Sequence, residues 1–466
     1  MGNTLNYNFL SVTIPLMKKT VTVFTEGKIL GPLIKFALPV LLALFLQTMY
    51  GAVDLLIIGQ FCESSDVSAV ATGSTLMFTL TSLFIGLSMG TTILLGQNIG
   101  KGKTDGAGDV IGSTIVSFAV LGVIVGAITL FLAPGMASVL QAPEEAFDAT
   151  VAYVRICAGG LLFIIAFNVL GSVFRGIGNS VMPLISVTIS TVINIIGDLV
   201  LIAVFNMGVA GAAIATVFAQ IMSVILSVLI IRKQNLPFKI TKNSLKPNEN
   251  LIRQIFRLGL PIAFQDMLVS TSFLFIMGIV NTLGLVASAS VGVSQRLSHF
   301  IMLLPSAYMQ SMSAFVAQNV GAGKHDRARK ALYCGIGTSL FVSVFMAYLS
   351  FFHGDVMAAI FTRDPLVMAG AWNYLKAFSI DTLLVSFLFC FIGYFNGYGK
   401  TTFVMIQGLI GAFGTRIPVS FIMSRLFGDN LFMVGLATPA SSVVQIILCM
   451  IVYVRLQNKL KKTQPA

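Results

Sequence analysis

An eleven-residue string returns almost unchanged 221 residues further along the chain, as QNIGKGKTDGA at Gln97–Ala107 and QNVGAGKHDRA at Gln318–Ala328. Two more pairs repeat in the same order, FRGIGNSVMPL with FNGYGKTTFVM and LPV with LPI, beginning at Phe174, Phe395, Leu38 and Leu260. Three markers in one order and register indicate a duplicated half of about 220 residues. Glycines and bases at corresponding places predict tight, charged turns that are used twice.

The composition restricts what each half can fold into. The chain is 56% hydrophobic and 10% charged, and its mean hydropathy is +0.92, whereas soluble domains carry about 25% charged residues. Its apolar runs suit helices that cross a hydrocarbon layer roughly 30 Å thick, and the polar–apolar alternation of a transmembrane barrel is not seen. The sequence therefore predicts an all-α integral membrane protein.

We expect twelve transmembrane helices in two pseudo-symmetric bundles of six. The predicted order is a lead-in, a first bundle, a linker with a short surface helix, a second bundle and a basic tail, at 1–28, 29–231, 232–257, 258–455 and 456–466. The first bundle would hold helices near 34–59, 67–96, 108–133, 148–174, 183–205 and 209–231. The second would hold helices near 258–281, 286–317, 329–352, 370–394, 402–426 and 431–455.

The placement of lysine and arginine predicts the orientation. Of the 29 basic residues, 23 fall in the two chain ends and in alternate connections, including Lys18, Lys19 and Lys103, while the opposite connections carry acids such as Glu63 and Glu144. Basic connections face the cytoplasm, so both termini would be cytoplasmic. Six crossings per half make the repeats parallel, which is typical of transporters that bind substrate between the halves. A duplicated channel or scaffold remains the alternative.

Other function classes find little support. The net charge of +12 resides in the predicted loops, so we expect no nucleic-acid partner. The chain has no GxxxxGK[ST] loop, and three scattered histidines give no metal-binding or catalytic spacing. No paired spacing relates the cysteines, so we expect neither a disulfide nor a metal site; these are Cys62, Cys157, Cys334, Cys390 and Cys449.

Two acids of the first half, Asp54 and Asp198, fall inside predicted helices. They lie six and eight residues from the outer ends of their helices, so both would be about 9 to 12 Å deep and could face one another. Asn194 is one turn from Asp198 on the same face. Thr216 and Tyr153 would reach a similar level from two further helices.

No lysine or arginine is predicted at that depth, since Lys35 and Arg155 lie near opposite helix ends. Two carboxylates in a low dielectric cannot both remain charged and unpaired, so one is protonated or a cation lies between them. Either case describes an ion-coupling site for H⁺ or Na⁺ that needs no other metal or cofactor. The alternative is two acids satisfied separately by backbone or water.

The second half has different charges. Val419 stands 221 residues after Asp198, so that acid is not duplicated. We expect Arg296, Asp381 and Arg416 to form a structural charge cluster. Asp266, with its neighbour Gln265, would instead line a substrate path.

Pro39 interrupts the hydrogen bonding of the first predicted helix and favours a kink there. A helix that carries Asp54 beyond a kink could bend as that acid changes charge. An ordinary membrane-helix proline is an equally good interpretation.

Several segments resemble the multidrug and toxic compound extrusion (MATE) transporters: ALPVLLALFLQTMYGAVDLLIIGQ, GQNIGKGK, FRGIGNSVMPL, NIIGD and GVAGAAIATVFAQ. This resemblance covers nearly the whole chain and implies that Asp54, Asp198 and Asn194 match the family's cation site. It also implies that Thr216 and Tyr153 belong to that pocket, and that Pro39 is the proline whose bending accompanies protonation. Val269 and Val385 stand where another branch carries acids, which argues against a second cation site.

The resemblance implies a monomeric antiporter in a bacterial-type inner membrane, exporting amphipathic, cationic drugs or dyes in exchange for H⁺ or Na⁺. The bilayer and these small molecules would be its partners. A lipid-linked oligosaccharide flippase of the same superfamily, an ion channel and a membrane enzyme remain the alternatives.

Overall fold

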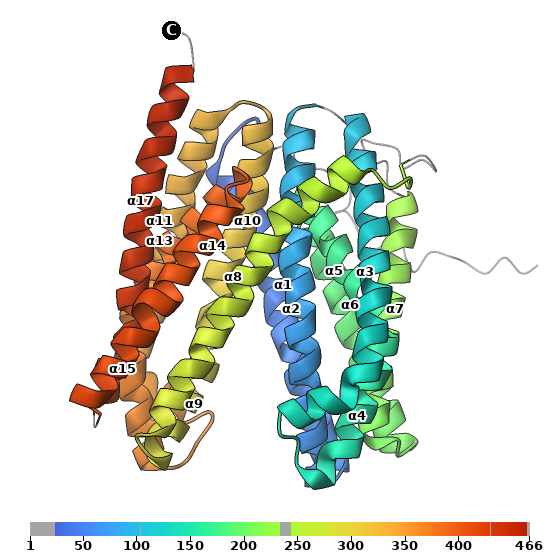
Figure 1. Ribbon diagram of the computed structural model, residues 1–466, viewed down its shortest axis with the longest axis vertical. Coiled ribbons are helices and arrows are strands. Elements are labelled where there is room, and N and C mark those ends of the chain that lie inside the picture. The colour runs from blue at the N-terminus through green and yellow to red at the C-terminus, as the bar shows by residue number, and fades with distance from the viewer. Residues whose placement is uncertain (1–23, 103, 234–243, 429, 464–466) are drawn as a thin grey trace, which may run out of the picture.

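The computed structural model describes residues 24–102, 104–233, 244–428 and 430–463, and every regular element in these ranges is a helix (Figure 1). The predicted Lys18, Lys19 and Lys103 lie outside the described residues. The first half contains α1 to α7 and a π-helix, η2. Their bounds are α1 Leu30–Phe61, α2 Ser64–Gly100, α3 Thr104–Val139, α4 Glu144–Gly159, α5 Leu161–Gly176, α6 Val181–Asp198, η2 Leu199–Val204 and α7 Gly208–Lys233.

The second half repeats this plan with more interruptions. It consists of α8 Glu249–Asn281, α9 Leu285–Ile301, α10 Leu303–Gly321, α11 His325–Phe352, α12 Gly354–Ala358, α13 Pro365–Gly397, α14 Thr401–Leu409, the π-helix η3 Ile410–Arg416, α15 Ile417–Leu426, α16 Leu431–Gly435 and α17 Ala437–Thr463. The described part of the predicted linker includes the first turns of α8, which Asn248 caps through its side chain, while residues 234–243 of that linker lie outside the described residues.

In the described part of the chain, eleven helical spans are long and apolar enough to cross a membrane. The pair α4 and α5, bent by 57°, makes a twelfth if it is counted as one span. Large apolar side chains such as Phe131, Phe341 and Leu285 are exposed. Exposed apolar surface on this scale suits contact with lipid, and the predicted all-α membrane fold with two repeats is confirmed.

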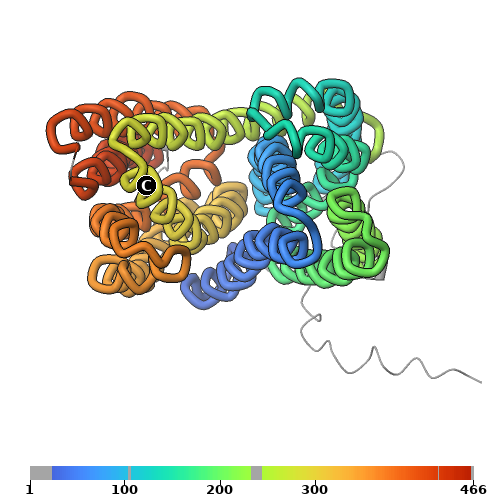
Figure 2. Tube along the Cα trace, turned by 90° about the horizontal axis from the view of Figure 1, so that it is seen from below, coloured from blue at the N-terminus to red at the C-terminus, as the bar shows by residue number. Residues whose placement is uncertain are grey.

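The two halves form separate bundles that stand side by side (Figure 1). Seen from below, α1 and α8 lie where the bundles meet (Figure 2). Each of these helices packs against the other bundle, α1 against α10 and α8 against α2, while α2 and α10 also contact each other. The first helix of each half therefore belongs to both bundles.

We call the end of the molecule with the turns after α2, α5, α10 and α13 the basic end. There the repeated strings meet: a Cβ on Gly100 would overlap the carbonyl of Gln318, and a Cβ on Gly321 would overlap the carbonyl of Gln97. Only glycine permits backbones to approach this closely.

Two glutamine side chains complete this junction reciprocally. Gln97 donates to the Gly397 carbonyl at 3.0 Å, and Gln318 donates to the Gly176 carbonyl at 3.2 Å. Donor and acceptor come from opposite bundles in each case, and both pairs are related by the 221-residue repeat. We call Gln97, Gly176, Gln318 and Gly397 the clamp.

The segment before α1 is bound to the second bundle. The Phe24 ring stacks on Phe315, and its backbone N–H donates to Gln318 Oε1 at 3.1 Å. The Arg327 guanidinium donates to four backbone carbonyls of residues 24–28. The described part of the predicted lead-in is therefore attached to the clamp.

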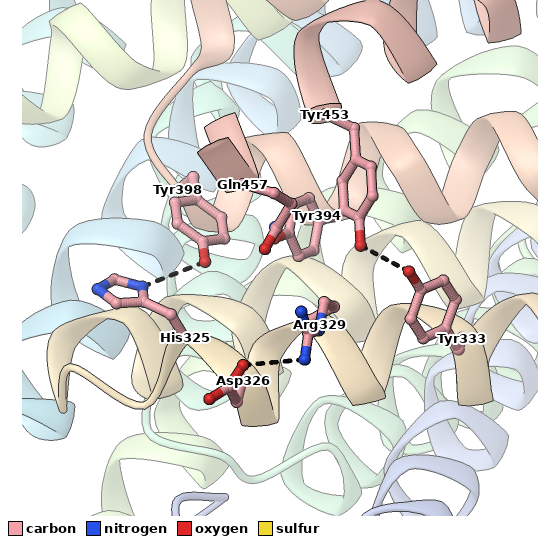
Figure 3. Close-up of polar contacts among 8 residues, drawn as sticks. All are labelled: His325, Asp326, Arg329, Tyr333, Tyr394, Tyr398, Tyr453 and Gln457. Atoms are coloured by element: carbon pink, nitrogen blue, oxygen red, sulfur yellow. Dashed lines mark hydrogen bonds and ion pairs between the residues drawn. The ribbon is translucent and has the colours of Figure 1, made fainter. Parts of the chain in front are cut away.

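Tyrosines join α11, α13 and α17 near the same end (Figure 3). The Tyr333 and Tyr453 hydroxyls are 2.8 Å apart, and Gln457 donates to the Tyr394 hydroxyl at 2.9 Å. His325 Nδ1 lies 3.1 Å from the Tyr398 hydroxyl. These contacts fasten the helices of the second bundle to one another, next to the turn that carries the clamp.

Candidate functional site

The structure brings Asp54 and Asp198 together. Asp54 points inward from α1 and is 4% exposed, while Asp198, the last residue of α6, is fully buried. The two carboxyls lie within reach of each other, and Asp54 also faces Asn194 and Thr216. Four of the five predicted site residues thus meet inside the first bundle, on α1, α6 and α7.

Two tyrosines border these acids. Tyr153 of α4 is buried, and it faces Thr216 and Asp54. Tyr50, which we did not predict, is close to Asp54, Asp198 and Thr216. It precedes Asp54 by four residues, so both occupy one helix face. The four-residue spacing between Tyr50 and Asp54 is the feature of the sequence that could have identified Tyr50.

Local departures from α-helical geometry position the site. The backbone turns into the π-helix η2 directly after Asp198, and π-helical turns occur frequently at functional sites. On the opposite wall the α4–α5 span bends at Gly160, where a Cβ would overlap the Val217 side chain of α7. The bend lets α4, which carries Tyr153, pack closely against α7.

The two acids of the site have no basic partner in the described residues. Among residues 24–102, 104–233, 244–428 and 430–463 the one ion pair is Asp326–Arg329, at the basic end. Asp54 Oδ1, both Asp198 oxygens and the Thr216 hydroxyl are buried and make no aligned hydrogen bond within these ranges. Buried polar groups are normally satisfied, so this oxygen-rich set fits a proton or a hard cation.

No cluster of three or more histidine, cysteine, aspartate or glutamate residues suitable for a metal occurs in the described ranges. The site's own acids number two, supplemented by amide and hydroxyl oxygens. A tight calcium site needs six to eight oxygen ligands. The few oxygens of this site suit a weakly held monovalent ion better.

Pro39 lies inside α1, which continues as one helix from Leu30 to Phe61. The proline lacks an N–H, so the helix loses one backbone hydrogen bond at this level. The helix is unbroken at Pro39 in this conformation, and bending of α1 at Pro39 stays a prediction.

In the second bundle, Arg416 and Asp381 are both buried and within electrostatic reach of each other. Arg416 donates to Ser272 Oγ at 3.1 Å, and Asp381 accepts from Ser442 at 2.5 Å. Arg296, expected in the same cluster, has an exposed side chain on α9 instead. The charge pair holds α8, η3, α13 and α17 together without it.

The predicted substrate-path residues diverge. Gln265 of α8 is buried and packs against Gly408 of α14. Asp266, one residue further, is exposed. Neighbouring residues on a helix point about 100° apart, so these two side chains have different surroundings, and the substrate path stays a prediction.

A second polar site lies between the bundles, where we predicted none. The polar side chains that line a small cavity there include Gln47 of α1, Asn168 and Arg175 of α5, and Gln310 of α10, and apolar side chains of α1, α5 and α6 complete its wall. Arg175 belongs to the repeated string FRGIGNSVMPL, which we predicted to form a tight, charged turn at the surface. Its position at the end of a helix concealed that its long side chain extends back along α5.

A family model described as MatE matches residues 39–200 and 261–422. These two matches cover more than half of the chain, one in each bundle. The chain belongs to the MatE family. The resemblance to MATE transporters is thereby confirmed, and the protein is a membrane transporter, not an enzyme.

The MatE assignment agrees with full-length similarities. The chain is 27% identical over 408 residues to the probable multidrug resistance protein YpnP of Bacillus subtilis, covering 87% of this chain and 91% of that protein. It is 28% identical over 417 residues to the multidrug export protein MepA of Staphylococcus aureus, covering 87% and 89%.

Among solved structures, an outward-facing MATE family transporter of the MOP superfamily superposes with a TM-score of 0.89 at 19% identity, covering 96% of this chain and 99% of that one. At this identity the likeness concerns the fold. The two-bundle MatE fold therefore extends over nearly the whole chain.

Proposed function

We propose that this MatE transporter is a multidrug exporter that exchanges H⁺ or Na⁺ for amphipathic organic compounds. The relatives named as multidrug resistance and export proteins support the drug class. The observation that carries ion coupling is the pair of buried acids, Asp54 and Asp198, which face one another without a base. Cation entry would neutralise this pair, and cation release would restore its charge.

Two features of the bundles support alternating access. The clamp and the close contacts around Gly100 and Gly321 join the bundles at the basic end. The basic turns favour a cytoplasmic location for this end and for both termini. We therefore infer that the described conformation is closed towards the cytoplasm, in a bacterial-type plasma membrane.

The energy available depends on the charge of the exported compound. For a compound without net charge, one cation entering across 100 mV provides about 2.3 kcal/mol, which supports a roughly fifty-fold gradient when exchange is tight. For a monovalent cation the exchange moves no net charge, and the concentration gradient of the entering ion drives it. The binding of an ion at Asp54 would act on α1, which contacts both bundles. Neutralising an acid of α1 can thus alter how the bundles pack.

The test uses purified protein in liposomes with a fluorescent cationic dye. An imposed pH gradient, with or without a sodium gradient, should drive dye movement in the wild type, and the pattern identifies the ion. Asp54→Asn and Asp198→Asn should each reduce ion-driven movement at least tenfold, because the amide cannot exchange a proton or offer a negative charge.

Asp148→Asn is the matched control, since Asp148 is exposed at the start of α4. It should transport normally. Normal ion-driven transport in either site variant would contradict the proposal. Flux that neither saturates nor exchanges one solute for another would instead indicate a channel.

A further inference from the structure

The cavity between the bundles contains a guanidinium whose charge has no partner in the site described above. Arg175 lies at the end of α5, and its side chain passes over Gly171, where a Cβ would come within 3.3 Å of Nη1. The absence of a side chain at Gly171 therefore makes room for the guanidinium. The group is directed towards the cavity that Gln47, Asn168 and Gln310 line.

The Arg175 donors are only partly used. Nη2 donates to Ser172 Oγ at 2.8 Å, and this hydroxyl is also 2.6 Å from Ser88 Oγ. Nε is buried and has no hydrogen-bond partner among the described residues. No acid in residues 24–102, 104–233, 244–428 or 430–463 forms an ion pair with Arg175.

A base without an acidic partner between packed helices needs compensation. Charged residues between transmembrane helices are costly unless they pair with an opposite charge or face a polar cavity. The planar guanidinium presents parallel N–H donors that match the two oxygens of a carboxylate. The amides of Gln47, Asn168 and Gln310 add neutral donors and acceptors around it.

The size of the cavity limits what it can receive. Its volume is about 50 Å³, well below the roughly 300 to 1,000 Å³ of pockets that enclose a whole ligand. It can hold a single small group of a larger molecule. It lies between helices of both bundles, so the rest of that molecule would extend along their interface.

We propose that Arg175, Gln47, Asn168 and Gln310 form a subsite for the carboxylate of a transported molecule. The preferred substrates are then zwitterions or amphipathic acids, in addition to simple cations. This proposal rests on the function proposed above, because it names a substrate class for the same exporter.

The test compares two dyes that differ in one group, a cationic xanthene dye with a free carboxylate and the methyl ester of that dye. Binding is measured by fluorescence anisotropy on purified protein in lipid nanodiscs. The wild type should bind the acid at least tenfold more tightly than the ester. Arg175→Gln should bring the two affinities within twofold, and Arg175→Lys should keep part of the preference.

Two further variants make the result specific. Arg155→Gln makes the same change at an exposed position of α4 and should leave the preference intact. Gln310→Glu places a carboxylate on the opposite wall of the cavity, and it should remove the preference while Arg175 is retained. If Arg175→Gln fails to fold, Gln310→Glu tests the subsite by itself, and an unchanged acid–ester preference in this variant would overturn the subsite.

Equal wild-type affinity for the two dyes, including no binding of either, overturns the subsite. Equal loss of acid and ester binding in a folded Arg175→Gln also overturns it, because Arg175 would then be structural. Failure of the proposed function looks different, since Asp54→Asn would transport normally while the acid–ester preference is unchanged.

Discussion

Asp381 and Arg416 illustrate, at the scale of single residues, how the duplicated bundles diverged. Both are buried, and each has a charged neighbour and a serine partner. Asp54 and Asp198 are equally buried but lack a base. Asp381 has the guanidinium of Arg416 within longer-range electrostatic reach, whereas no base acts on Asp54 or Asp198, which on our proposal require a proton or cation. Buried charged residues therefore stabilise the second bundle, whereas in the first bundle, on our proposal, they bind and release the coupling ion.

Arg416→Ala should lower the stability of the second bundle. Arg416 and Asp381 lie beyond ion-pair distance, so the substitution removes the hydrogen bond to Ser272 and a longer-range attraction to Asp381, which costs roughly 1 to 3 kcal/mol. The melting temperature in detergent should fall by several degrees. Arg296→Ala, at an exposed site, should leave it unchanged.

The same Arg416→Ala protein should retain ion-driven dye movement per folded molecule, because Arg416 lies outside the acid site. Selective loss of coupling at normal stability would show that the second bundle takes part in ion exchange.

At the scale of elements, the helices were predictable but their breaks were not. Apolar runs and glycine-rich turns located most span ends within a few residues, but α8 begins nine residues before its predicted start and α17 ends eight residues after its predicted end, because both helices continue beyond their apolar run into polar sequence. The π-helix after Asp198 and the bend at Gly160 depend on what packs against them, here Val217 in the case of Gly160. Arg175 was assigned to a turn because spacing along the chain does not reveal where a long side chain points.

Gly160→Ala should destabilise the protein by roughly 1 to 3 kcal/mol, because the added methyl overlaps Val217 and overpacking carries a cost of that size. A melting curve in detergent measures the loss. Gly159→Ala is the control, since no other atom lies within 4 Å of a Cβ at Gly159.

Val217→Ala should restore part of the stability that Gly160→Ala loses. Such coupling is expected of residues in contact. Additive effects of the two substitutions would contradict the packing explanation for the bend.

At the scale of the whole molecule, the repeat predicted two bundles and suggested one use for the repeated turns. It did not predict that Gln97 and Gln318 each reach into the opposite bundle. Their acceptors, the carbonyls of Gly397 and Gly176, are distant in sequence and become neighbours only when the bundles assemble. On the alternating-access proposal, the pseudo-symmetry would make both contacts form or break together.

Removing both clamp donors should favour opening at the basic end. Each hydrogen bond contributes about 1 kcal/mol, so the double variant Gln97→Leu with Gln318→Leu should shift the equilibrium by roughly ten- to thirty-fold. A cysteine at Ala314, buried one turn behind Gln318, reports opening through its reaction with a maleimide in a cysteine-free background.

Gln60→Leu, at the exposed far end of α1, is the control for the clamp experiment and should not change the labelling rate. An unchanged rate in the double variant would mean that the glycine contacts alone keep the basic end closed.

The attachment of Phe24 to Gln318 has a practical consequence for anyone who handles this protein. The side-chain amide of Gln318 accepts a hydrogen bond from the segment before α1 through its oxygen and donates one to the first bundle through its nitrogen. Affinity tags or fusion partners joined just before Phe24 would therefore disturb the hydrogen bonds of Gln318. Turnover measured with such fusions should differ from that of protein tagged at the carboxyl terminus.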